Sequence, residues 1–217
     1  MKAVLISIQP KWCELIASGK KTVEVRKTKP KIDVPFKCYI YCTQGGDWLT
    51  SVNGKVQKPN HMVLDLVLDN KIEELNGKVI GEFVCDRIDV YPYDCHIGYP
   101  TPQYEGDDSF CDCGEGYWIT YKEIEDSCLT QDELMDYGRG ETLYGWHISN
   151  LVIYEQPKEL SEFYHYCGDN PNCEGCEAHY YSNTECGKED YCCSPMEGCK
   201  PIKRPFQSWG YVYEVDT

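Results

Sequence analysis

A short polar segment, Gly19–Arg26 (GKKTVEVR), carries the residue types best suited to bind or act on a ligand. If residues 22–26 form a strand, Thr22, Glu24 and Arg26 lie on one face and the two valines face the core. Arginine offers a planar fork to phosphate, carboxylate or a base edge, and a desolvated lysine such as Lys21 can act as a base. The alternative is an exposed strand carrying an ion pair that contributes little stability.

The elements around this segment must hold it in place. Lys2 to Ile8 is an apolar, β-branched run, which predicts a strand. Pro10 suits the first turn of a helix, and apolar residues follow it at helical spacing. Gly19 is a natural left-handed end for that helix. The polar segment is therefore predicted to be a strand entered from a helix and a turn.

Further elements follow from hydrophobic patterning and turn residues. Thr130 to Glu133 is a capping box that opens a short helix ending near Gly138, and residues 158–166 have a helical pattern. Strand patterns occur at residues 37–43, 78–90, 143–154 (a candidate strand pair) and 209–215. Residues 44–77 and 91–127 are rich in turn residues, which predicts irregular insertions with one short ordered piece at 63–68.

Many short strands around one early helix predict an α+β fold built on a small, mostly antiparallel β-barrel with a few short helices. A length of 217 residues suits a single domain with insertions, here spanning 1–217. The first eight residues form a strand rather than a signal peptide, since their apolar run is short and lacks a cleavage site. No stretch approaches the roughly 20 apolar residues of a membrane span. We therefore expect a cytoplasmic protein that does not enter membranes.

Charge is unevenly distributed along the chain. The formal net charge is −15, which argues against a protein that coats duplex DNA. Residues 11–37 nevertheless hold eight basic residues against three acidic ones. One basic island in an acidic protein suits a small anionic ligand better than a long polyanion. A solvated, lysine-rich loop is the competing interpretation.

A cysteine-rich segment occupies about residues 165–200. Thiols in the cytosol are not expected to pair as disulfides, and Cys173-x2-Cys176 has the spacing of half a tetrahedral zinc site. Few aliphatic residues are present there to hold the segment in one shape. We expect a structural zinc ion, with ligands among Cys167, Cys173, Cys176, Cys192 and Cys199. A flexible, reduced loop is the alternative.

The motif Gly19-x-Lys21-x-x-Glu24-x-Arg26, directly after a short helix, resembles the GxKxxExR signature of ASCH domains. Other parts of the chain also resemble members of this family, namely the opening strand and the segments 78–83 and 143–148. The closing segment Pro205–Trp209 resembles that of members from phages and prophages of Gram-positive bacteria. The resemblance covers residues 1–90 and 130–217 in outline. It implies a PUA-like β-barrel with a cleft for RNA, a nucleotide or a modified nucleoside.

The resemblance also implies roles for individual residues. The cleft would be lined by Lys21, Thr22, Glu24 and Arg26. One bacterial branch of the family hydrolyses acetylated cytidine with a Lys, a Thr and a distant Glu, and Lys21 matches that Lys. The Thr of that branch falls at Glu24, so deacylation by the same mechanism is in doubt. A hydrolase with Glu24 as base and Lys21 as electrophile remains chemically open.

Residues far from the motif are secondary candidates. Gln207 and Trp209 could supply a hydrogen bond and a stacking surface to a base, although core packing is the competing role for Trp209. Trp146 and His147 are neighbours on a strand, so one should be buried and the other should face the ligand or solvent.

Three functions are consistent with the sequence. The first is a module that binds RNA, a nucleotide or a modified nucleoside without chemistry. The second is a small hydrolase acting on a modified nucleoside or on RNA, amidohydrolase- or ribonuclease-like. The third is a phage accessory protein that acts through protein–protein contacts of its acidic surface.

Overall fold

The computed structural model describes residues 2–45, 48–52, 55–58, 72–94, 116–166 and 201–214. The chain divides into two compact units. Unit 1 comprises Met1–Pro10, Lys37–Glu82 and Ile153–Thr217, and unit 2 comprises Lys11–Phe36 and Phe83–Val152. The predicted cysteine ligands, Cys167, Cys173, Cys176, Cys192 and Cys199, lie outside the described residues.

Unit 1 is built on β-strands. Its strand β1 (Lys2–Ile8) pairs antiparallel with β11 (Trp209–Tyr213) and parallel with β3 (Phe36–Cys42). The pattern of buried residues in β1 matches the apolar run of its sequence, which explains why this segment is a strand. A separate small sheet has the order β5-β4-β6. Its strands are β4 (Thr50–Val52), β5 (Lys55–Gln57) and β6 (Ile72–Glu74).

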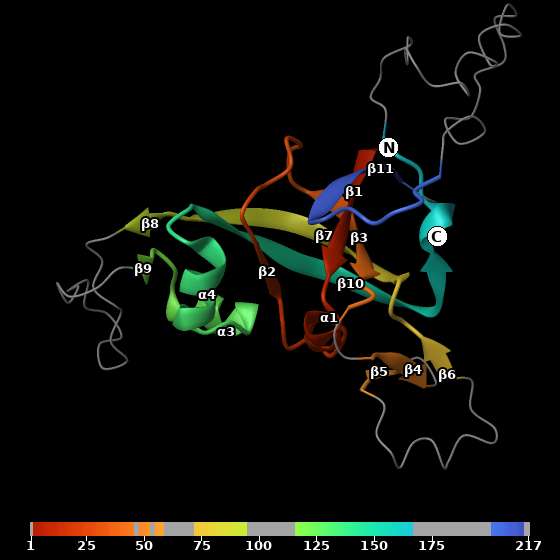
Figure 1. Cartoon of the computed structure of the whole chain (residues 1–217). Helices are drawn as coiled ribbons and strands as arrows, with labels where there is room; N and C mark the ends of the chain where they lie inside the picture. Colours follow the sequence, from red (N-terminus) through yellow and green to blue (C-terminus); the bar gives the residue numbers. More distant parts are fainter. Residues whose placement is uncertain are drawn as a thin grey trace, which may run out of the picture. The chain divides into compact units, whose positions relative to one another are not determined.

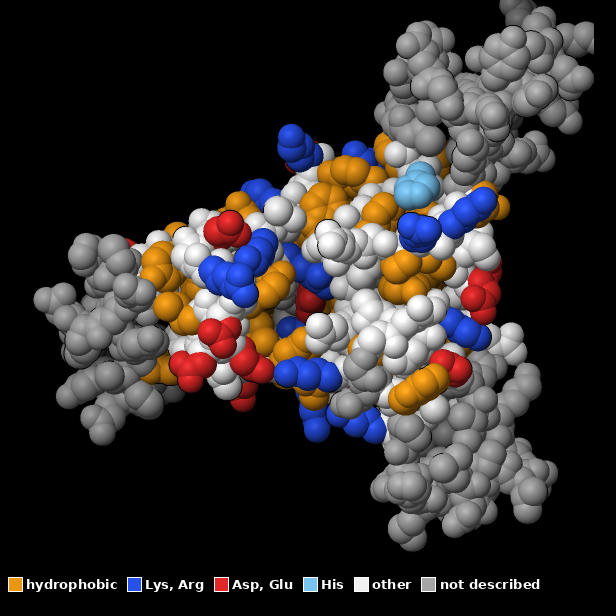
Figure 2. Space-filling view, in the orientation of Figure 1, with side chains coloured by type: hydrophobic (Ala, Val, Ile, Leu, Met, Phe, Trp, Pro, Cys, Tyr) orange, Lys and Arg blue, Asp and Glu red, His pale blue; other side chains and the backbone are white. Residues whose placement is uncertain are grey.

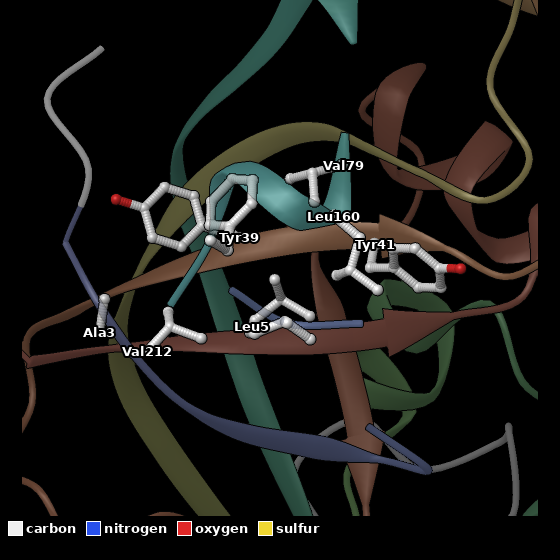
Figure 3. Close-up of a cluster of buried hydrophobic side chains, with 9 residues drawn as sticks. Ala3, Leu5, Tyr39, Tyr41, Val79, Leu160 and Val212 are labelled. Carbon is white, nitrogen blue, oxygen red and sulfur yellow. The ribbon is translucent and has the colours of Figure 1, made fainter. Parts of the chain in front are cut away.

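The core of unit 1 gathers side chains from β1, β3, β11 and the residues after β10 (Figure 3). Tyr39 and Phe163 meet edge to face there, with ring centroids 4.9 Å apart. The fully buried members include Ala3, Leu5, Tyr39, Val79, Phe163 and Val212. Strand β1 is therefore anchored by apolar contacts on the side of this core.

Among the described residues, the α-helices lie in unit 2, apart from the first residue of α1 (Figure 1). They are α1 (Pro10–Ala17), α3 (Tyr121–Ser127) and α4 (Gln131–Gly138), together with strands β2 (Val23–Arg26), β8 (Tyr93–Asp94) and β9 (Gly116–Tyr117). Helices α3 and α4 each begin with a capping box, in which a threonine and a glutamate satisfy each other's backbone N–H. The core of unit 2 joins Val23 and Val25 to Tyr91, Tyr117, Leu134 and Leu143.

Two long strands, β7 (Lys78–Tyr91) and β10 (Leu143–Glu159), contribute residues to both units. The largest sheet has the hydrogen-bonded order β11-β1-β3-β7-β10-β2. The fold is thus mixed α+β with a mostly antiparallel sheet and few helices, as predicted. The strand order does not close on itself among the described residues, so a closed barrel, like a single domain over 1–217, stays a prediction.

Several local predictions need correction. Residues 143–154 form part of one long strand, not a strand pair, and that strand continues to Glu159. The helix predicted over 158–166 is only the 3-10 turn η1 (Leu160–Glu162). Helix α3 and strand β9 lie within the segment 91–127 that was predicted to be irregular, and β4, β5 and β6 lie within 44–77. The piece predicted at 63–68 lies outside the described residues.

In the part of the chain that the structure describes, no helix is both long and apolar enough to cross a membrane.

Candidate ligand site in unit 2

The polar segment begins where helix α1 ends. Gly19 has a φ of +73°, a left-handed conformation in which glycine is the favoured residue. The backbone N–H groups of Lys20 and Lys21 both donate to the carbonyl of Leu15, which closes the helix end. Thr22 then donates its N–H to the carbonyl of Asp126, next to the end of α3. These bonds fix the direction in which the chain enters β2.

Strand β2 alternates as predicted. Val23 and Val25 are buried in the apolar core of unit 2. Glu24 and Arg26 are buried as well, as is Lys21 just before the strand, whereas Thr22 is half-buried. The interpretation of this segment as an exposed strand with a surface ion pair is therefore wrong. Lys21 is only 2% exposed, an unusual position for a lysine.

Glu24 lies between the two cations and contacts both. Its Oε2 is 3.3 Å from Lys21 Nζ, and its Oε1 is 2.9 Å from a terminal nitrogen of Arg26. Lys21 Nζ also donates a 2.6 Å hydrogen bond to the carbonyl of Ser127, the last residue of α3. Burial of charges is costly unless they are paired, and this arrangement pairs them. The ends of α1, α3 and β2 thus converge on one ionic cluster, Lys21–Glu24–Arg26.

Two aromatic residues accompany the ionic cluster. Lys21 Nζ lies 5.0 Å from the ring centroid of Trp12, within the range of a cation–π contact. Tyr137, on α4, lies close enough to Arg26 and Glu24 for both to act on its hydroxyl. Burial raises the pKa of Tyr137, Arg26 lowers that pKa, and Glu24 raises it. The phenol is therefore protonated at neutral pH and can donate a hydrogen bond.

Tyr137, Ser127 and Trp12 lie beside the ionic cluster but are not among the predicted site residues. The signal for Ser127 was present, because Thr120-x-x-Glu123 is a second capping box that opens α3. No comparable signal exists for Tyr137. Its approach to Glu24 and Arg26 depends on how α4 packs in unit 2.

Trp146 and His147 divide as the alternation predicts. Trp146 pairs opposite Glu24 in the β10–β2 ladder, is fully buried, and packs edge to face on Phe36 at 5.9 Å between ring centroids. His147 pairs opposite Val23 and so points to the other face of these strands. His147 therefore does not join the ionic cluster.

The remaining candidates belong to unit 1. Gln207 is exposed, and Trp209 is half-buried in β11, where it contacts Tyr211 edge to face. Their predicted role in ligand binding stays a prediction.

Two lysines of the basic island in unit 2 are matched with carboxylates. Lys11 lies 3.3 Å from Glu133, and Lys27 lies 3.5 Å from Glu141. Figure 2 shows acidic and basic side chains intermingled over the region of α3 and α4. Such exposed pairs contribute little stability, but they break up the positive surface. The island is therefore not a continuous basic track in unit 2.

The first part of the chain is similar to a known protein family. Residues 6–91, less than half of the chain, match the family model of the ASCH domain. No curated protein matches.

Solved structures of ASCH from Zymomonas mobilis are similar over most of the chain. The crystal structure of that protein is 18% identical, covers 73% of this chain and 73% of its own, and gives a TM-score of 0.42. Its Tyr-to-Phe variant is 16% identical, covers 74% of this chain and 77% of its own, and gives a TM-score of 0.40.

Proposed function

We propose that this chain is an ASCH-domain protein that binds RNA, a nucleotide or a modified nucleoside through the ionic cluster Lys21–Glu24–Arg26. The observation that carries the proposal is the burial of Lys21 and Arg26 against the Glu24 carboxylate. The three side chains together carry a formal charge of +1 in a desolvated setting, which favours an anionic group such as a phosphate. PUA-like proteins, which ASCH domains resemble, are generally RNA-associated.

The surroundings of the ionic cluster favour a small ligand or a short stretch of RNA. Arg26 offers a fork for phosphate, Trp12 a face for stacking, and Tyr137 a hydroxyl donor. Two of the lysines that a long polyanion could contact, Lys11 and Lys27, are paired with glutamates. A net charge of −15 acts in the same direction, because it repels long nucleic acids.

Binding is favoured over hydrolysis by the state of Glu24. Both of its oxygens contact a cation, so the carboxylate is engaged and poorly prepared to take a proton from water. The hydrolase with Glu24 as base and Lys21 as electrophile is the second candidate, supported by their 3.3 Å contact. The phage accessory protein acting through protein contacts is the third, supported by the acidic net charge.

The decisive experiment is a binding screen with nucleosides, nucleotides and short RNAs, followed by product analysis on every hit. We expect Lys21→Met to weaken binding of a phosphate-bearing hit by about tenfold or more, since a buried charge-assisted contact is lost. Lys20→Met is the matched control, because Lys20 is the adjacent lysine and is exposed. Arg26→Lys should weaken binding less than Arg26→Met, since it keeps the charge and loses the fork.

Glu24→Gln separates the three candidates. A binding protein should retain or gain affinity for an anionic ligand, because the substitution removes a negative charge. A hydrolase should keep affinity and lose turnover. Equal loss of affinity in the Lys20 and Lys21 variants would contradict the binding site, and a biological effect that survives loss of both Lys21 and Arg26 would favour the accessory protein.

We also propose that the protein is a cytoplasmic protein of phage type. We further propose that its cysteine-rich segment, at about residues 165–200, binds a structural zinc ion. Protein purified without chelator should contain one zinc ion per chain by elemental analysis, and thiol-specific modification should release it. Cys173→Ser together with Cys176→Ser should abolish the zinc content. Cys13→Ser, a cysteine buried in α1, is the control and should leave it unchanged. Metal-free protein would contradict this proposal.

A further inference from the structure

A second group of chemically capable side chains lies in unit 2, apart from the ionic cluster. Asp89 on β7, Glu123 on α3 and His147 on β10 each offer a ligand atom, and these atoms all lie within 4.8 Å of one another. All three residues are half-buried. His147 projects from the face of the β2–β10 pair opposite to Glu24, so this group is distinct from the ionic cluster.

Glu123 is oriented by contacts on both sides. Its Oε2 accepts hydrogen bonds from the N–H and the hydroxyl of Thr120, at 2.9 and 2.7 Å, as the capping box of α3. Its Oε1 accepts a 3.3 Å hydrogen bond from the hydroxyl of the buried Tyr91. Gly145 makes room for that hydroxyl, since a Cβ there would lie 2.1 Å from it. The carboxylate is thus held in place by residues that pack around it, as metal-binding carboxylates commonly are.

His147 lies between a carboxylate and a guanidinium. His147 Nε2 lies 2.6 Å from Asp89 Oδ2 and 2.9 Å from a guanidinium nitrogen of Arg87. Nε2 carries at most one proton, so it cannot donate to Asp89 and accept from Arg87 at once. A metal ion bound in place of the Arg87 guanidinium would instead accept lone pairs from both Nε2 and the Asp89 carboxylate.

We propose that Asp89, Glu123 and His147 form a binding site for a divalent transition-metal ion. Two carboxylate oxygens and one imidazole nitrogen suit ions such as manganese(II) or iron(II). Three protein ligands leave further coordination positions open to water or to a substrate oxygen. The metal site shares no residue with the ionic cluster.

Arg87 acts as an internal cation that competes with the metal ion. Its guanidinium is 3.0 Å from Asp89 and 2.9 Å from His147, so it occupies the position that a bound metal ion would take. The Arg87 side chain is 61% exposed, so it can swing into solvent when an ion binds. Removing this arginine should therefore strengthen metal binding rather than weaken it.

The test uses Mn²⁺ and the full chain. Mn²⁺ prefers oxygen and nitrogen ligands, so the 15 cysteines compete for it far less than for zinc. Electron paramagnetic resonance detects the loss of free aqueous Mn²⁺ on binding. We expect one Mn²⁺ per chain, with affinity lowered about tenfold or more by His147→Gln and by Asp89→Asn. Arg87→Ala should raise the affinity several-fold.

Two further variants guard against a loss of fold. Glu123→Gln keeps the capping box, in which glutamine also serves, and should weaken Mn²⁺ binding. Glu125→Gln changes an exposed neighbour on the same helix and should not. Circular dichroism checks that each variant is folded. Absence of Mn²⁺ binding by both the unmodified protein and Arg87→Ala, or undiminished binding by folded His147→Gln, would overturn the proposal.

Discussion

Replacement of Glu24 by alanine is expected to lower the free energy of unfolding by about 3–5 kcal/mol, the usual cost of removing one partner from a buried ion pair. Lys21 and Arg26 would be left buried without the carboxylate that lies 3.3 and 2.9 Å from them. Native proteins are stable by only about 5–15 kcal/mol, so the variant should be close to unfolding. Urea denaturation followed by circular dichroism measures the change.

A triple replacement tests whether the charges serve stability or binding. Lys21→Met, Glu24→Leu and Arg26→Met together remove all three charges of the cluster, and apolar replacement of a whole buried ionic group is often neutral or stabilising. We expect this protein to recover most of the stability lost in Glu24→Ala and to bind no ligand. If the triple variant were as unstable as Glu24→Ala, the ionic cluster would be a structural requirement of unit 2. Glu14→Ala, a half-buried glutamate of α1, is a control for loss of a carboxylate elsewhere.

Trp146→Ala should be comparably damaging, again by about 3–5 kcal/mol. The indole is fully buried, stands opposite Glu24 in the β10–β2 ladder and packs on Phe36. Its removal leaves a large cavity beside the strand that carries the ionic cluster. Thermal unfolding and urea denaturation measure the loss. Trp146→Phe should recover much of it, because an aromatic ring still fills part of the space.

Trp48→Ala is the matched control for Trp146→Ala. The Trp48 side chain is 60% exposed, so its truncation should change stability by less than about 1 kcal/mol. Similar losses in the two variants would show that Trp146 does not have the packing role described here.

Much of the local structure near the motif was predictable because it depends on neighbouring residues. Gly19 ends α1, and the alternation from Val23 to Arg26 sorts apolar from charged side chains. Both features need only the periodicity of a strand and the conformational freedom of glycine. The capping box at Thr130 likewise depends only on neighbouring residues, and it predicted the start of α4.

Other features depend on contacts distant in sequence. The full burial of Lys21 requires the carbonyl of Ser127, which lies 106 residues away in the chain. The strand predicted over 143–154 stops short of Pro157, a residue that weakens a strand pattern, yet β10 continues to Glu159. Asp89, Glu123 and His147 are spaced too widely for any motif to join them, and only the packing of β7, α3 and β10 does so.

The paths of β7 and β10 limit how this protein can be divided or recombined. Unit 1 draws on three separate stretches of sequence and unit 2 on two, and both strands cross from one unit into the other without a linker. A gene fragment that encoded one unit alone would have to cut a strand between Glu82 and Phe83 and another between Val152 and Ile153. No continuous fragment of the chain therefore contains either unit without residues of the other.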